Sequence, residues 1–91
     1  MADASPRYLI PEDVVARELA DESLLVHLGS GTYFGLDATG TRIWQLLSEH
    51  GSADAVLAEL LVEFDVDEPR LRRDLADFIA RLLDKGLLVA G

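Results

Sequence analysis

The chain has 91 residues, no cysteine, a formal net charge of −9 and a hydrophobic content of 49%, which fits one domain with one core. Without cysteine, disulfides, thiolate zinc sites, iron–sulfur clusters and cysteine nucleophiles are excluded. The acidic balance repels phosphate backbones and anionic lipid, so we expect neither a nucleic acid nor a membrane as partner.

Residues 1–11 are predicted to form a flexible N-terminal arm, and residues 12–91 a single domain. Pro6 and Pro11 disfavour regular structure in this arm. Apolar side chains at positions 8–10 can attach it to the core. Neither a secretory signal nor a bilayer-spanning apolar run is visible, so we expect a cytoplasmic protein.

Three short segments, residues 14–19, 23–28 and 32–36, are predicted to be β-strands. Asp21-Glu22 supplies a polar turn between the first two, and Gly29-Ser30-Gly31 makes a hairpin loop between the second and third. The third segment is rich in aromatic and β-branched residues, as strands are. We expect the three strands to form an antiparallel meander.

After residue 36 the apolar spacing becomes helical. Three helices are predicted: one from a cap at Asp37 or Thr39 to His50, one from Ser52 to Phe64, and one from Glu68 to Lys85. This order predicts an α+β fold in which a three-stranded antiparallel sheet is followed by three helices on one of its faces. The last two helices make the arrangement winged-helix-like.

The third predicted strand lies at an edge of the meander, where backbone N–H and C=O groups lack partners. Residues 32–36 contain no charge and no proline, whereas the opposite edge carries Arg17 and Glu18. Gly35 lets another backbone come close. Three explanations remain open: the edge is covered by the chain's own arm, pairs with a second copy, or receives a peptide as an added strand.

The run GTYFGLDATGTRIWQLL, from Gly31 to Leu47, resembles the pyrroloquinoline-quinone biosynthesis protein D family. The downstream segments Phe64-Asp-Val-Asp67 and Leu82-x-x-x-Gly-Leu-Leu88 match the same family. The resemblance extends over nearly the whole chain, from about residue 12 to residue 89. It implies a peptide recognition element for ribosomally made, post-translationally modified peptides.

The resemblance implies that the leader of a precursor peptide pairs with the third strand and lies against the last helix. It also implies a separate modifying partner, and we favour a lasso-type leader protease over a radical-SAM enzyme of pyrroloquinoline quinone synthesis. We expect a monomer or weak dimer. The candidate peptide-binding residues are Thr32, Tyr33, Phe34, Gly35, Leu36, Leu71, Asp74, Leu75 and Phe78, with Arg70 and Arg73 as contacts for acidic leader residues.

The last predicted helix carries most of the basic charge, which leaves a winged-helix DNA-binding protein as an alternative. Its arginines are spaced i,i+4 from acidic residues, as in Arg70/Asp74, Arg73/Asp77 and Asp77/Arg81. We therefore expect these opposite charges largely to pair with one another on a solvated face of the helix. We find no nucleophile with a base and no cluster of metal ligands. The sequence therefore predicts no enzyme activity, no cofactor and no metal.

Overall fold

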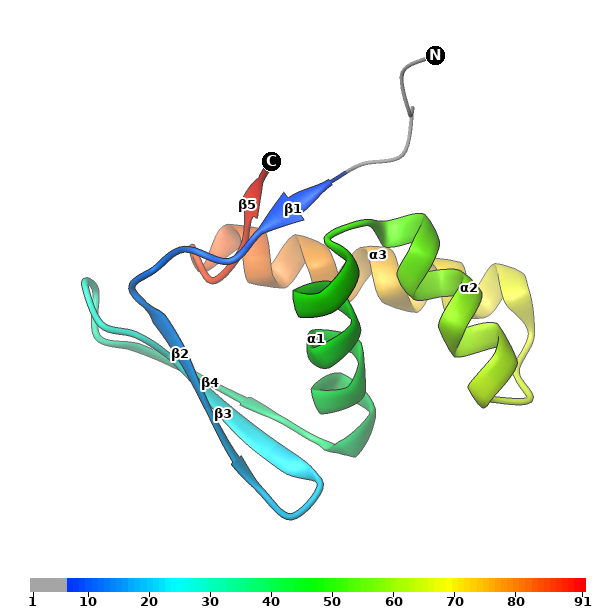
Figure 1. The fold of residues 1–91 in the computed structure, drawn as a ribbon, viewed down its shortest axis with the longest axis horizontal. Helices are drawn as coiled ribbons and strands as arrows, with labels where there is room; N and C mark the ends of the chain where they lie inside the picture. The colour runs from blue at the N-terminus through cyan, green and yellow to red at the C-terminus, as the bar shows by residue number, and fades with distance from the viewer. Residues whose placement is uncertain (1–6) are drawn as a thin grey trace.

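The computed structural model describes residues 7–91. Strands β2 (Val14–Leu19), β3 (Glu22–His27) and β4 (Thr32–Leu36) form an antiparallel sheet in the order β2-β3-β4 (Figure 1). The predicted meander is confirmed, although β3 begins one residue earlier than expected. Leu19 pairs with Glu22, so the first turn contains two residues.

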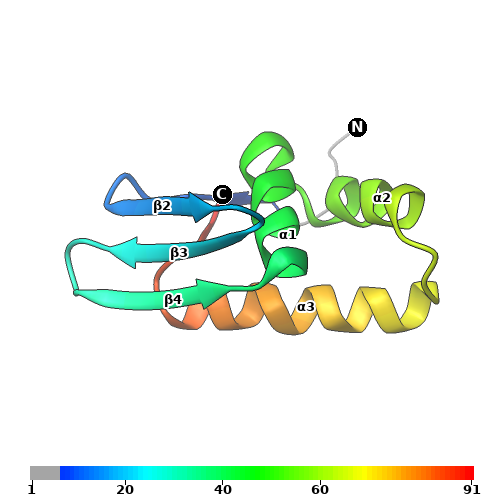
Figure 2. The same ribbon diagram turned by 90° about the horizontal axis from the view of Figure 1, so that it is seen from below.

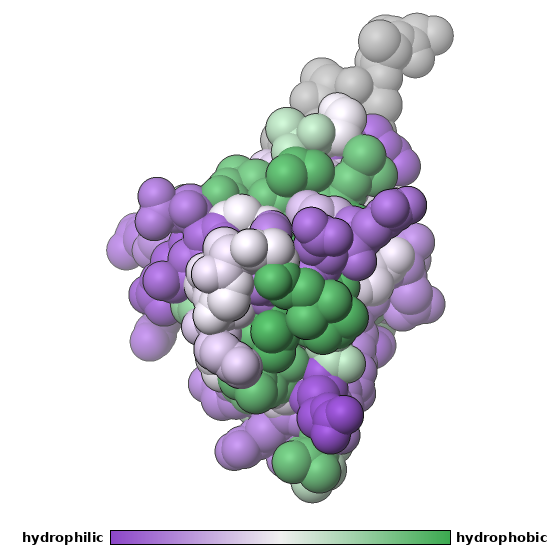
Figure 3. Space-filling model, turned by 90° about the vertical axis from the view of Figure 1, so that its left-hand side faces the viewer, coloured by the Kyte–Doolittle hydropathy of each residue, from purple (hydrophilic) through white to green (hydrophobic). Residues whose placement is uncertain are grey.

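The sheet has one face toward the helices and one toward solvent, because side chains alternate along each strand. On β3, Ser23 and Leu25 are buried under the helices, while Leu24 is exposed. Val15 on β2 and Tyr33 on β4 are exposed on the same outer face as Leu24. Figure 3 shows hydrophobic side chains gathered on this side of the molecule.

Three helices follow the sheet: α1 (Ala38–His50), α2 (Ala53–Glu63) and α3 (Glu68–Asp84). The carboxylate of Asp37 accepts a hydrogen bond from the Gly40 N–H at 2.8 Å and caps α1. The predicted α+β fold and its three helices are thus confirmed, with α3 ending one residue before the predicted Lys85. Within residues 7–91, none of the helices combines the length and the hydrophobicity that a bilayer-spanning segment needs.

The core lies between the inner face of the sheet and the three helices. Leu25 from β3 is fully buried, and Trp44 from α1 is 4% exposed. Leu87 and Leu88 return from the end of α3 into the same core. The hydroxyls of Ser23 and Thr41 share a buried hydrogen bond of 2.7 Å, which satisfies both polar groups and fixes α1 against β3.

A second, two-stranded sheet joins the two ends of the described chain. Strand β1 (Tyr8–Leu9) pairs antiparallel with β5 (Val89–Ala90). The Tyr8 N–H also donates to the Gly51 carbonyl at 2.7 Å. Positions 8–10 of the predicted arm are therefore held on the domain, whereas residues 1–6 lie outside the described residues.

Candidate functional site

Strand β4 presents an unpaired edge. In the described part of the chain, β4 pairs with β3 on one side, and no segment pairs with its other side. The N-terminal strand β1 pairs with β5 instead. The described part of the arm therefore does not cover the edge, and none of the five residues of β4 is charged.

A groove of about 440 Å³ runs beside this edge. Figure 2 shows β4 and α3 on the same side of the molecule, running in opposite chain directions, with the start of α1 at the end of β4. These three elements line the groove with Phe34, Gly35, Leu36, Asp37, Thr39, Gly40, Ile43, Asp74, Asp77, Phe78 and Arg81.

The wall of the groove is apolar at its base and polar at its rim. Leu36 and Ile43 are buried in the core, while the rings of Phe34 and Phe78 are half-buried. Gly35 carries no side chain, and a Cβ built on it would point to the outer face of the sheet, as Tyr33 does, and would meet no atom within 4 Å. An extended peptide beside β4 could therefore reach its backbone and direct alternate side chains into the groove.

The structure brings together five of the residues predicted for the site: Phe34, Gly35, Leu36, Asp74 and Phe78. The other predicted residues lie elsewhere. On β4, Thr32 is half-buried and Tyr33 is 66% exposed on the outer face of the sheet. On α3, Leu71 packs against the core, and the exposed Arg70 and Arg73 lie outside the groove lining.

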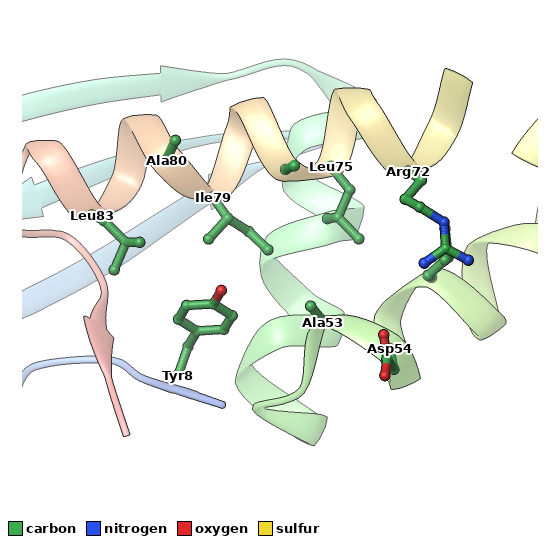
Figure 4. A pocket seen from close by; sticks show the side chains of 10 residues that line it. Tyr8, Ala53, Asp54, Arg72, Leu75, Ile79, Ala80 and Leu83 are labelled. Carbon is green, nitrogen blue, oxygen red and sulfur yellow. The ribbon is translucent and has the colours of Figure 1, made fainter. Parts of the chain in front are cut away.

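Leu75 lies on the other side of α3. It is 4% exposed and faces a separate cavity of about 390 Å³ between α3, α2 and Tyr8. Figure 4 shows Leu75, Ile79 and Leu83 projecting from α3 toward Tyr8 and Ala53. The apolar stripe of α3 is wide enough to line both this cavity and the groove. Helical spacing alone therefore does not show which apolar residues face the cavity and which face the groove.

Several residues of the groove were not among the predicted site residues. Asp37, Thr39, Asp77 and Arg81 line the groove, and Lys85 lies beside it. The Lys85 Nζ atom is 5.8 Å from the centre of the Phe34 ring, a cation–π distance. Positions 74, 78, 81 and 85 are three or four residues apart, so they share one face of the helix. Starting from Asp74, this spacing would have found both basic residues.

The expected ion pairs along α3 do not form. Neither Arg70 with Asp74, nor Arg73 with Asp77, nor Asp77 with Arg81 makes an ion pair within 4 Å in the described chain. On this helix Arg72 pairs with Glu68 at 2.7 Å instead. The spacing allows such pairs but does not require them, because exposed side chains gain little by holding one geometry.

The sequence model for coenzyme PQQ synthesis protein D (PqqD) matches residues 22–88, which span all of the central elements from β3 to the end of α3. The chain belongs to the PqqD family. The resemblance inferred from the Gly31–Leu47 run is thereby confirmed. No curated protein sequence matches this PqqD-family chain significantly.

Two solved structures share the fold of this PqqD-family chain. TbiB1 in complex with the TbiA(beta) leader peptide is 46% identical, with a TM-score of 0.82, over 87% of this chain and 92% of TbiB1. A lasso peptide synthetase B1 complexed with the leader peptide is 23% identical, with a TM-score of 0.81, over 91% and 98% of the two chains. Both are similar along nearly their full length.

Proposed function

We propose that this chain binds the leader segment of a ribosomally synthesised precursor peptide as an added strand on β4, and presents the precursor to a separate enzyme. The observation that carries the proposal is the edge of β4, which is uncharged and unpaired within residues 7–91, beside a groove with two half-buried aromatic rings, Phe34 and Phe78. Main-chain pairing along β4 supplies affinity, and the groove supplies side-chain selectivity.

The similarity to TbiB1 supports the proposal of leader binding, because that relative is bound to a leader peptide. We favour a lasso-type role, in which a separate leader protease acts on the presented precursor. The fold shared with a lasso peptide synthetase B1 agrees with this role. A PqqD-type role with a radical-SAM enzyme would use the same groove, and adding either enzyme to the bound precursor distinguishes the two.

A titration with the TbiA(beta) leader peptide tests the proposal. We expect a dissociation constant of about 10 μM or tighter, which corresponds to roughly −7 kcal/mol. Backbone amide signals of Thr32–Leu36 should shift during an NMR titration of the ¹⁵N-labelled protein. Absence of binding at about 1 mM peptide, with these amides unmoved, would refute strand addition to β4.

Two neighbouring aromatic residues of β4 provide a matched pair of variants. Phe34 lines the groove, whereas Tyr33 points to the outer face of the sheet. We expect Phe34→Ala to weaken leader binding about tenfold, because it removes apolar contact area from the groove wall. Tyr33→Ala should leave the affinity within about twofold.

Isothermal titration calorimetry measures both variants, and circular dichroism checks that each remains folded. Phe34→Leu restores an apolar wall and should recover most of the affinity. Equal losses in Phe34→Ala and Tyr33→Ala would show that the leader does not enter the groove.

A further inference from the structure

The charged residues of the groove are sorted along its length. Asp37 follows the last residue of β4, and Asp74 and Asp77 lie near the middle of α3. Arg81 lies one turn further along that helix, and Lys85 directly follows its last residue. Because β4 and α3 run in opposite directions, one end of the groove is acidic and the other is basic (Figure 2).

The position of Lys85 fixes which end of the strand is basic. Its Nζ atom lies over the ring of Phe34, in the middle of β4 and before Leu36. Asp37 stands at the opposite end, where the chain enters α1. The basic end of the groove therefore lies beside Phe34, and the acidic end lies beyond Leu36, where α1 begins.

These charges are available to a ligand. In the described chain, Asp74, Asp77 and Arg81 form no ion pair within 4 Å, and all three are exposed. Lys85 is also exposed and contacts the face of an aromatic ring rather than a carboxylate. A peptide strand in the groove would lie beside both the acidic pair, Asp74 and Asp77, and the basic pair, Arg81 and Lys85.

We propose that the groove reads the order of charges in the peptide: a basic side chain beside Asp74 and Asp77, and an acidic side chain beside Arg81 and Lys85. The inference rests on the proposed function. Antiparallel pairing is the commoner arrangement, and the peptide's amino end then lies at the Leu36 end of β4. The basic residue therefore precedes the acidic one in the peptide sequence.

The spacing of the two peptide charges follows from the helix. At roughly 1.5 Å per residue, the midpoint of Asp74 and Asp77 lies about 11 Å along α3 from the midpoint of Arg81 and Lys85. Charges about three to four residues apart in an extended peptide, at roughly 3.4 Å per residue, would therefore reach both groups. Closer charges would meet only one end.

Two synthetic versions of the TbiA(beta) leader peptide test the inference. One carries Lys before and Glu after the segment that pairs with β4, and the other carries Glu before and Lys after it. We expect the Lys-first peptide to bind about tenfold more tightly at low ionic strength, since each exposed pair changes the affinity severalfold at most. The difference should shrink as salt is added.

A charge-swapped chain is the decisive variant. Replacing Asp74→Lys, Asp77→Lys, Arg81→Glu and Lys85→Glu exchanges the two ends and leaves the net charge at −9. The preference between the two peptides should invert. Retention of the wild-type preference, or equal binding of both peptides to the wild-type chain, would overturn the inference.

Single variants keep the test decisive if the swapped chain fails to fold. Arg81→Glu should reduce the preference for the Lys-first peptide, whereas Arg17→Glu should preserve it, because Arg17 is exposed on the far strand β2. An equal effect of both variants would overturn the inference. If the unmodified leader peptide does not bind at all, the proposed function itself fails, which separates the two conclusions.

Discussion

At the scale of single residues, the turn between β2 and β3 carries backbone strain. Ala20 has a φ of 57°, and among residues 7–91 it is the non-glycine residue with positive φ. An alanine Cβ disfavours this left-handed region. The pairing of Leu19 with Glu22 leaves two residues for the turn, so the strain is set by the register of the hairpin.

Ala20→Gly should stabilise the protein by up to about 1 kcal/mol, because the relief of left-handed strain exceeds the extra entropy of glycine in the unfolded chain. Thermal and urea unfolding measure the change. Gly31→Ala is the matched opposite variant, since Gly31 has a φ of 73° and a Cβ built there meets nothing within 4 Å.

Gly31→Ala should therefore destabilise the protein by about 1 kcal/mol through the backbone alone. A loss of stability in Ala20→Gly would contradict the assignment of strain to this turn.

At the scale of elements, one ion pair connects α1 to α2. Arg42 donates to both carboxylate oxygens of Glu63, at 2.8 and 2.5 Å. This hydrogen bond, assisted by the positive charge, lowers the pKa of Glu63 below its ordinary value, although partial desolvation opposes the shift. The same bond raises the pKa of Arg42.

The lowered pKa of Glu63 predicts how this contact depends on pH. A carboxylate that is more acidic in the folded state stabilises the fold above its unfolded pKa, and the contribution disappears as pH falls through the folded pKa. Glu63→Gln should therefore be less stable than the wild type near pH 7, and equally stable in acid below the folded pKa.

Urea unfolding across the acid range measures this difference. In an Arg42→Met background, Glu63→Gln should show a smaller pH-dependent difference, because the hydrogen-bond donor is gone. A difference that persists unchanged in acid would refute the assignment.

The elements of the fold differ in how well the sequence predicts them. Strands β2 to β4 and the three helices lie within one residue or so of their predicted ranges, because alternation and helical spacing extend over several residues. Strands β1 and β5 have two residues each, too few to show any period. Their pairing depends on a contact between distant parts of the chain, which local patterns do not encode.

The site shows the same division. Residues 32–36 contain no charge and no proline, and this composition predicted an open edge at β4. The strand side of the groove could therefore be predicted from the sequence. The helical wall was only partly found, because Leu75 and Phe78 belong to one stripe yet face different hollows. Which side of α3 faces β4 depends on how the core is packed.

At the scale of the whole molecule, the groove belongs to the folded core. Leu36 and Ile43 line the groove and also lie in the core cluster. The groove therefore exists only when the strands and helices are assembled. A ligand that occupies it binds the folded state and shifts the unfolding equilibrium.

The leader peptide should therefore raise the melting temperature. At a free concentration of about 100 times its dissociation constant, the stabilisation is about 2.7 kcal/mol. For a domain of this size, that corresponds to a shift of roughly 10 to 20 °C. Differential scanning calorimetry measures the shift, and Phe34→Ala should show a smaller one at the same peptide concentration. An unchanged melting temperature would contradict binding to the folded groove.

The pairing of β1 with β5 places both ends of the described chain together. The Gly91 N–H donates to the Arg7 carbonyl at 2.9 Å. None of the residues lining the groove comes from these two strands. Such a geometry suits circular permutation. It also lets the domain be inserted into a surface loop of another protein, because its two ends can join the loop side by side. The peptide-binding edge would stay exposed in either arrangement.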